Sequence, residues 1–292
     1  MIITKLIGGL GNQMFQYAAG RRASVVNKTE LKLDITEYDH QVGITHRVYM
    51  LNVYKIHASI ATKSEIEAFK SLSLDFTARS WHRLKILLLR RHYLRQKASH
   101  FTHELLNAAD NSYLDGYWGS EKYFSDIGEI IRKDFTLKKK PDKTNSDLIQ
   151  HIKNCNSVSI HVRRSDYVKD KKTHDFHGVC GLVYYKKAIS LITKKVMNPS
   201  FFIFSDDPDW CKANFRLRYP TTYVTHNLEK NDCEDMRLMS MCKHNIIANS
   251  TFSWWGAWLN RNPDKIIVAP KRWFTNKSIN TEDLIPNSWI KI

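Results

Sequence analysis

The order of apolar and polar positions predicts an α/β unit at the start of the chain. An apolar run occupies residues 2–7, and the glycine-rich turn GGLG follows it. From about residue 12 to residue 27, apolar residues recur with helical spacing, and a second short strand is predicted at 30–35. A continuous apolar run, a glycine turn and an amphipathic helix are the typical order of a buried strand followed by its covering helix.

The pattern is more regular in the second half of the chain. Its predicted strands lie at 158–162, 201–204, 245–248 and 266–268, and they alternate with predicted helices at 184–195, 209–214, 234–241 and 252–260. This alternation predicts a mostly parallel sheet covered by helices on both faces. Polar residues and a proline gather between residues 138 and 156. We therefore divide the chain into an N-terminal domain, 1–150, and a C-terminal domain, 151–292.

Composition agrees with a folded globular protein of two domains and leaves its partner open. The 292 residues lie near the upper limit of about 250–300 for a single hydrophobic core. Forty-five Lys and Arg against 29 Asp and Glu give a formal net charge of +16. Such a charge attracts an anion, which can be nucleic acid, an acidic membrane face or a phosphorylated small molecule.

Cysteine spacing and hydropathy predict a cytoplasmic protein. The five cysteines form no Cys-x-x-Cys pair, which favours structural thiols in a reducing compartment over a zinc or redox site. No segment has the ~18 apolar residues of a membrane span, and the N-terminus has no apolar core of a signal peptide. The Leu-rich basic segment 81–97 is the one exception to a simple soluble pattern. It is expected to form an amphipathic helix, which either packs normally with a solvated basic face or makes a peripheral contact with the inner, anionic membrane face.

Polar residues stand where predicted strands end, which is where open parallel sheets bind ligands. In the first such segment, GGLGNQ, the Gly-x-Gly resembles the start of a dinucleotide fingerprint, and Asp34 lies near the spacing of a ribose-binding acid. Met14 stands in place of the third glycine and would obstruct close packing of helix on strand. A nicotinamide-dependent oxidoreductase is therefore disfavoured. The glycines, Gly11 among them, then form a tight turn, and the amide of Asn12 can orient a ligand hydroxyl.

An arginine motif, HVRRSDY, follows the strand at 158–162. The adjacent guanidinium groups of Arg163 and Arg164 suit a diphosphate, because each presents a fixed fork of donors to phosphate oxygens. The alternative is an ion pair between Arg164 and Asp166 that holds the loop. We expect one arginine to anchor the loop and the other to meet the ligand.

Two carboxylates, Asp206 and Asp207, follow the strand at 201–204 and leave three interpretations open. They can hold Mg²⁺ or Mn²⁺ with a nucleotide diphosphate, cap the next helix, or accept hydrogen bonds from a purine edge. Because the arginines already supply positive charge for a diphosphate, capping or base recognition is favoured over a metal.

A run of hydroxyl residues, NSTFS, joins the strand at 245–248 to a Trp-rich helix. A helix N-terminus presents free N–H groups and the positive end of the helix dipole, so Ser250 and Thr251 can contribute to an anion site. The alternative is an ordinary N-cap. The tryptophans of this helix are expected to belong to the core.

Together, the motifs GGLGNQMFQYA, HVRRSDY, FSDDPDW and NSTFSWWGAWLN resemble, in order and spacing, those of the bacterial α-1,2-fucosyltransferases, glycosyltransferase family 11. The resemblance runs from residue 2 to about residue 274. It implies an α/β fold of two Rossmann-like domains facing a cleft, the GT-B type. It also implies inverting transfer of L-fucose from GDP-fucose to the 2-hydroxyl of a terminal galactose on an oligosaccharide or lipid-linked glycan, with no metal and no cofactor besides the donor substrate.

The resemblance further implies roles for individual residues. Related fucosyltransferases share no single catalytic carboxylate, and Asp166 is our candidate for the base. Arg163 is implied to bind the GDP phosphates with Arg164 in support, and His161 and Asp206 or Asp207 are implied to lie near the guanine. Ser250, Thr251 and Phe252 are implied to contact the diphosphate. Gly11 is expected to contribute to donor binding, and Asn12 to lie toward the reacting sugar and the acceptor.

Two other classes of protein remain as alternatives at this point. A metal-dependent nucleotide-sugar transferase or hydrolase with another donor would use the carboxylates as metal ligands. A nucleic-acid-binding protein would explain the net charge, but the sequence contains no recognition motif of that class, so we expect no nucleic-acid partner.

Overall fold

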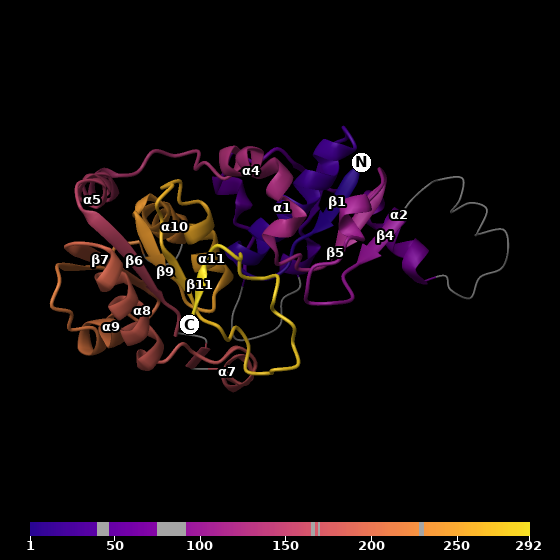
Figure 1. Ribbon diagram of the computed structural model, residues 1–292. Helices are drawn as coiled ribbons and strands as arrows, with labels where there is room; N and C mark the ends of the chain where they lie inside the picture. The colour runs from indigo at the N-terminus through magenta and orange to yellow at the C-terminus, as the bar shows by residue number, and fades with distance from the viewer. Residues whose placement is uncertain (40–46, 75–91, 165–166, 169, 228–230) are drawn as a thin grey trace, which may run out of the picture. The chain divides into compact units, whose positions relative to one another are not determined.

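The computed structural model describes residues 1–39, 47–74, 92–164, 167–168, 170–227 and 231–292 (Figure 1). The chain divides into two compact units. The first comprises Met1–Lys138 and Asn280–Leu284, and the second comprises Lys139–Ile279 and Ile285–Ile292. The division that the sequence suggests, between residues 150 and 151, falls inside helix α5 (Lys143–Lys153), all of which belongs to the second unit.

A five-stranded parallel sheet forms the centre of the first unit, in the order β3-β2-β1-β5-β4. Its strands are β1 (Ile2–Lys5), β2 (Leu31–Asp34), β3 (Ser59–Ile60), β4 (His92–Arg95) and β5 (Ser112–Asp115). Its helices are α1 (Leu10–Val26), α2 (Lys63–Leu74) and α4 (Gly128–Asp134), and short 3-10 turns cover Thr36–Tyr38, Leu51–Val53, Leu105–Asn107, Glu121–Tyr123 and Ser125–Ile127. The predicted first strand, helix and second strand are confirmed to within two residues.

Helix α1 packs tightly on the sheet of the first unit through Gly20. A Cβ at that position would overlap Oγ1 of Thr4 and lie 2.9 Å from Cδ1 of Leu31. Gly20, and not Met14, therefore allows helix α1 to approach the sheet closely. Met14 itself is completely buried in the core.

The helix expected over 81–97 is wrong at its C-terminal end. Residues His92–Arg95 form β4, which pairs in parallel with β5. The ring of Tyr93 stacks on the buried ring of Tyr113 with centroids 5.1 Å apart. Pairing with a neighbouring strand and stacking across it therefore outweigh the helical pattern of the leucines. Residues 81–91 lie outside the described residues.

The second unit contains a six-stranded parallel sheet in the order β11-β10-β9-β6-β7-β8. Its strands are β6 (Asn156–Val162), β7 (Pro199–Ser205), β8 (Thr221–Val224), β9 (His244–Ile246), β10 (Ile267–Ala269) and β11 (Ile290–Lys291). Its helices are α5, α7 (Lys171–His177), α8 (Leu182–Lys195), α9 (Pro208–Asn214), α10 (Asp232–Met241) and α11 (Thr251–Trp258). The four predicted strands and four predicted helices are confirmed to within two residues. The two edge strands, β8 and β11, were not among them.

The order of strands in the second unit brings the polar motifs to one edge of the sheet. Strand β6 lies between β9 and β7, as Figure 1 shows, and all three run in the same direction. The register pairs Val162, the last residue of β6, with Ser205, the last residue of β7. The loops that follow these strands therefore leave the sheet at the same level. A core of apolar side chains from β6, β7 and α8 supports this edge; it includes Val158, Ile160, Val162, Phe201, Ile203, Tyr185, Ala188 and Ile192.

No helix within the described ranges combines the length and the apolar character needed to span a membrane.

Candidate active site

Two arginines after β6 meet two carboxylates after β7. Nη1 of Arg163 lies 3.1 Å from Oδ2 of Asp206, and the backbone N–H of Arg164 donates to Oδ1 of the same carboxylate at 2.8 Å. Nε of Arg164 donates to Oδ2 of Asp207 at 3.1 Å. The two arginine side chains remain 23% and 19% exposed, so a ligand at this edge of the sheet can reach both.

Arg164 makes a close stacking contact in addition to its ion pair. Its guanidinium carbon lies 3.9 Å from the ring centroid of Trp210, which is a stacking contact. Asp207, its carboxylate partner, also caps α9, because Oδ1 accepts a hydrogen bond from the backbone N–H of Trp210 at 3.2 Å. Of the interpretations open from the sequence, the structure thus supports capping for Asp207. Arg164 is anchored by Asp207 and Trp210, whereas the guanidinium of Arg163 lies 5.5 Å from the ring of Tyr167.

His161 connects the arginine loop to the start of α11. Its side chain is only 5% exposed, and its ring centroid lies 5.6 Å from that of Phe252. Burial and the nearby charge of Arg163 lower the pKa of His161 to about 3, so the imidazole is neutral near pH 7. Within the described part of the chain, no group bonds to its Nδ1. This edge therefore holds a buried ring nitrogen that has no hydrogen-bond partner among the described residues.

The loop between β9 and α11 is held by Asn249, which is 3% exposed. Its side-chain amide donates to the carbonyls of His177 at 2.9 Å, Gly178 at 3.3 Å and Trp273 at 3.1 Å. Its own backbone carbonyl accepts a hydrogen bond from the hydroxyl of Tyr167 at 3.4 Å. The buried side chain of Asn249 thus ties together the end of α7 and the segment at residue 273, and its backbone carbonyl adds Tyr167, the last residue of the arginine motif.

Helix α11 begins directly after Asn249, at the same edge of the sheet. Ser250 occupies the N-cap position in an extended conformation, and its hydroxyl makes no capping bond to this helix. No acidic residue stands in the first turn, so the N–H groups and the helix dipole favour an anion there. Thr251 and Phe252 are half-buried. Trp254 and Trp255 are completely buried, which confirms the expectation that they belong to the core.

The N-terminal glycine loop lies at the carboxyl end of β1 in the first unit. Gly8 has a φ of +77°, and a Cβ there would lie 2.7 Å from Nδ2 of Asn12. Asn12 is half-buried, whereas Gly11 is buried in the first turn of α1. Gln13 is completely buried and donates to the carbonyls of Gly8 at 3.1 Å and Val48 at 2.8 Å. Gln13 therefore stabilises the loop, and Asn12 is the amide that stays more accessible.

Arg47 and Asp34 of the first unit also bear on the role of the glycine loop. The guanidinium of Arg47 lies beside Gly9, 3.8 Å from the position of a Cβ on that glycine, and no sequence motif marks it. Asp34 is completely buried and accepts hydrogen bonds from Tyr113 at 2.6 Å and Lys70 at 3.1 Å. Burial alone would raise the pKa of Asp34, but these hydrogen bonds and those from Thr36 hold it below its usual value. Asp34 is therefore a structural residue of the fold.

Asp166, the candidate base, lies outside the described residues. Across the described ranges, no group of three or more His, Cys, Asp or Glu side chains is arranged to hold a metal ion. Asp206 and Asp207 each have an arginine partner instead.

Comparison of the sequence with protein families identifies the family of this chain. Residues 1–292 match Glycosyl transferase family 11. The chain belongs to this family. Two Escherichia coli proteins are similar over nearly their whole length. The α-1,2-colitosyltransferase is 35% identical over 300 residues, covering 100% of this chain and 99% of that protein, and the O-antigen biosynthesis glycosyltransferase WbnK is 36% identical over 320 residues, covering 98% and 99%.

More distant relatives agree with the family and with the fold. Human galactoside alpha-(1,2)-fucosyltransferase 1 is 26% identical over 155 residues, covering 50% of this chain and 42% of that protein. A solved structure of a mutant of Arabidopsis thaliana FUT1 in complex with GDP resembles this one with a TM-score of 0.55 at 10% identity, covering 98% of this chain and 74% of that one. The GT-B type of α/β fold, with one parallel sheet in each unit, is confirmed. As a family 11 member, the protein is a glycosyltransferase.

Some residues of the candidate site were not identified from the sequence. Trp210 stands three residues after Asp207, in the first turn of the capped helix, where a side chain can return to the preceding loop; this spacing was a usable signal. Asn249 and Tyr167 stand inside the quoted motifs, but their roles depend on His177 and Trp273, which are distant in sequence. No local pattern could have indicated those contacts.

Proposed function

We propose that this family 11 enzyme transfers L-fucose from GDP-fucose to the 2-hydroxyl of a terminal galactose, with inversion at the anomeric carbon and without a metal ion. The observation that carries the proposal is the meeting of Arg163, His161 and the start of α11 at one edge of the second unit's sheet. The α-1,2 linkage is supported by the similarity to the α-1,2-colitosyltransferase and to human galactoside alpha-(1,2)-fucosyltransferase 1.

Stabilisation of the leaving group is the main chemical task of these residues. As the bond between sugar and phosphate breaks, the sugar gains oxocarbenium character and negative charge grows on the diphosphate. The fork of Arg163 and the N–H and hydroxyl groups at Ser250 and Thr251 would meet that charge. Donors fixed in advance at a developing charge lower the barrier by ~3 kcal/mol each. Arg164, anchored on Asp207 and Trp210, would keep this loop in place.

A neutral His161 suits recognition of the nucleotide base. Its buried Nδ1 needs a hydrogen-bond partner, because a buried polar atom without one is costly. We assign this nitrogen and Asp206 to the neighbourhood of the guanine. Asp206 and Asp207 are both paired with arginines, and in the proposed reaction neither carboxylate is a metal ligand.

Removal of the acceptor proton is assigned to Asp166. Asn12 can hold the acceptor hydroxyl, but an amide takes no proton at neutral pH. A positioned general base contributes roughly 10²–10⁴-fold to the rate. Asp166→Asn is therefore expected to lower kcat within that range while donor binding is kept, and a near-normal kcat would remove Asp166 from this role.

Transfer of colitose is a second candidate, favoured by the 35% identity to a colitosyltransferase over the whole chain. Colitose is fucose without its 3-hydroxyl. A site that hydrogen-bonds this hydroxyl would reject the deoxy sugar strongly, whereas a site that leaves it solvated would accept both.

The test is a transfer assay with GDP-fucose and GDP-colitose as competing donors, a β-galactoside acceptor and excess EDTA. We expect fucosylated product with an α-1,2 linkage, identified by NMR, and almost none from Arg163→Ala of unchanged melting temperature. Preferred use of GDP-colitose would select the second candidate. Activity that appears only with added Mn²⁺, or hydrolysis of the donor without transfer, would contradict the proposal.

A further inference from the structure

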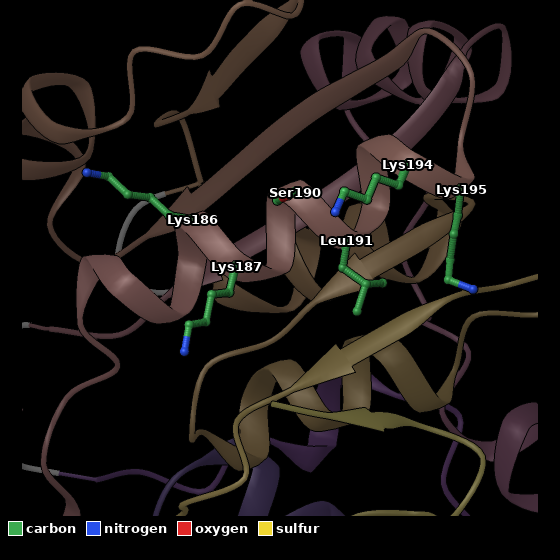
Figure 2. A pocket seen from close by; sticks show the side chains of 6 residues that line it. All are labelled: Lys186, Lys187, Ser190, Leu191, Lys194 and Lys195. Atoms are coloured by element: carbon green, nitrogen blue, oxygen red, sulfur yellow. The ribbon is translucent and has the colours of Figure 1, made fainter.

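Four lysines share the exposed face of helix α8. Lys186, Lys187, Lys194 and Lys195 line a shallow hollow together with Ser190 and Leu191. Figure 2 shows two of the lysines on one stretch of the helix and two toward its other end, with Ser190 and Leu191 between them. These positions recur with spacings of three and four residues, so they belong to one side of the helix. The opposite side, with Tyr185, Ala188 and Ile192, is buried in the core of the second unit.

The positive charge of this lysine face is not compensated locally. Helix α8 has the sequence LVYYKKAISLITKK and contains no acidic residue. All four lysines are exposed, and within the described ranges none of their ammonium groups pairs with a carboxylate. Four like charges on one helix face repel one another, which weakens an isolated helix slightly. An anionic partner would relieve that repulsion.

Exposed apolar side chains stand in the first turn of α8 and just after its end. Val183, in the first turn of α8, is 67% exposed, and Met197, two residues after the helix ends, is 80% exposed. Leu191 lies between the lysine pairs and is half-buried. Lysines interleaved with exposed apolar side chains are the composition of helices that lie in the interface of an anionic bilayer, where the apolar groups enter the acyl boundary and the ammonium groups meet phosphates.

We propose that the lysine face of α8 docks the enzyme on an anionic phospholipid bilayer. The proposal goes beyond the transfer reaction and does not depend on the identity of the donor. It also differs from the membrane contact expected of the segment 81–97, because it rests on another helix in the second unit.

The exposed apolar residues distinguish a bilayer from nucleic acid as the partner. A lysine patch that binds nucleic acid neutralises phosphates and gains nothing from an exposed Val183 or Met197. Binding to a bilayer gains from both the charge and the buried apolar area. Each lysine near an anionic surface contributes about fivefold to binding, so all four contribute roughly two to three orders of magnitude at moderate salt.

The experiment measures binding to sedimented vesicles of phosphatidylcholine containing about one third phosphatidylglycerol, compared with pure phosphatidylcholine. A variant with Lys186, Lys187, Lys194 and Lys195 changed to Gln should lose roughly a hundredfold or more in affinity for the anionic vesicles. The matched control changes Lys138, Lys139, Lys140 and Lys143 to Gln, which removes the same charge from exposed positions elsewhere. It should lose much less. Changing the four α8 lysines to Arg should keep binding.

A second pair of substitutions separates the possible partners. Val183→Ser with Met197→Ser should weaken binding to vesicles severalfold and leave binding to a short RNA duplex unchanged. All variants should keep wild-type transfer to a soluble acceptor, since no residue of the active site is altered. Equal vesicle binding by the α8 and control variants would overturn the proposal. So would lysine-dependent binding to RNA without binding to anionic vesicles.

Discussion

The two adjacent arginines have different surroundings, and the difference predicts different phenotypes. Arg164 stacks on Trp210 and pairs with Asp207, whereas Arg163 pairs with Asp206 and its charge acts on the buried imidazole of His161. Arg163→Lys is expected to lower kcat more than tenfold, because a point charge cannot reproduce the fork at a developing phosphate charge. Its melting temperature should stay close to wild type.

Arg164→Lys serves as the matched comparison for this prediction. It removes the stacking contact and the Nε hydrogen bond, so it should lower the melting temperature and reduce kcat less than Arg163→Lys does. Steady-state kinetics and thermal denaturation of both variants measure the two effects. The same modest loss of kcat in both would contradict the assignment of separate roles.

A buried group and a half-buried group of the second unit should give opposite pH dependences of stability. The pKa of His161 is lowered to about 3 by burial and by Arg163, whereas burial raises the pKa of Asp235 to about 7. In the unfolded chain these groups titrate near 6.5 and 3.9. Between about pH 4 and 6.5, the unfolded state holds one proton more at His161 and one proton fewer at Asp235. The unfolding free energy that depends on a neutral His161 therefore decreases as the pH falls through this range. The unfolding free energy that depends on a protonated Asp235 decreases as the pH rises.

Single substitutions should separate these opposing terms. Relative to wild type, the unfolding free energy of His161→Gln should improve as the pH falls from 6.5 toward 4.5, by up to about 1.4 kcal/mol per pH unit. Asp235→Asn should improve as the pH rises over the same interval. Denaturant titrations at several pH values measure both. Parallel curves for wild type and His161→Gln would show that the imidazole is not neutral in the folded protein.

At the residue scale, the sequence indicated which side chains are unusual but not always what they contact. A pair between Arg164 and Asp166 was one alternative from the sequence, and Asp166 lies outside the described residues; the pair that the structure does give Arg164 is with Asp207, which follows a different strand. The reason is the parallel register, which sets the ends of β6 and β7 level. Asp34 looked like a ligand residue by spacing alone and is instead buried under Tyr113 and Lys70.

At the scale of elements, the junction of β9 and α11 depends on one side chain. Asn249→Ala leaves three carbonyl groups without their donor, so the unfolding free energy should fall by about 2–4 kcal/mol. The affinity for GDP should fall as well, because Ser250 and Thr251 follow directly. Thermal denaturation and calorimetric titration with GDP measure the two effects.

Asn260→Ala is the control for the junction. Asn260 is 1% exposed and donates to Oδ1 of Asn245 at 2.8 Å and to the carbonyl of Lys243 at 3.3 Å, at the other end of α11. It should cost a similar stability and leave GDP affinity unchanged. If both variants weaken GDP binding in proportion to their loss of stability, Asn249 has a structural role only.

Helices and strands with a strong local pattern could be predicted from the sequence. Strands that form only because they pair with a neighbouring strand could not. Strand β6 alternates apolar with polar residues and strand β7 contains the apolar run FFIF, and both were found to within two residues. Strand β4 stands in a Leu-rich basic segment whose local pattern is helical, and only its pairing with β5 makes it a strand. The two-residue strand β11 likewise exists through its pairing with β10.

At the scale of the whole molecule, the proposal assigns nucleotide binding and acceptor binding to different units. The residues assigned to the nucleotide lie in the second unit, and Asn12, assigned to the acceptor, lies in the first. Binding of GDP and transfer of the sugar should therefore respond to different substitutions. Asn12→Ala is expected to lower kcat and to leave the dissociation constant for GDP unchanged, whereas Arg163→Ala affects both.

Calorimetric titration of GDP into wild type, Arg163→Ala and Asn12→Ala, with EDTA present throughout, tests the central claim most directly. The account predicts that GDP binds wild type and Asn12→Ala equally well without a divalent cation. It predicts that Arg163→Ala binds at least tenfold more weakly at an unchanged melting temperature, since a charge-assisted hydrogen bond contributes about 1.5–3 kcal/mol. Wild-type affinity in Arg163→Ala, or binding that requires Mg²⁺ or Mn²⁺, would contradict it.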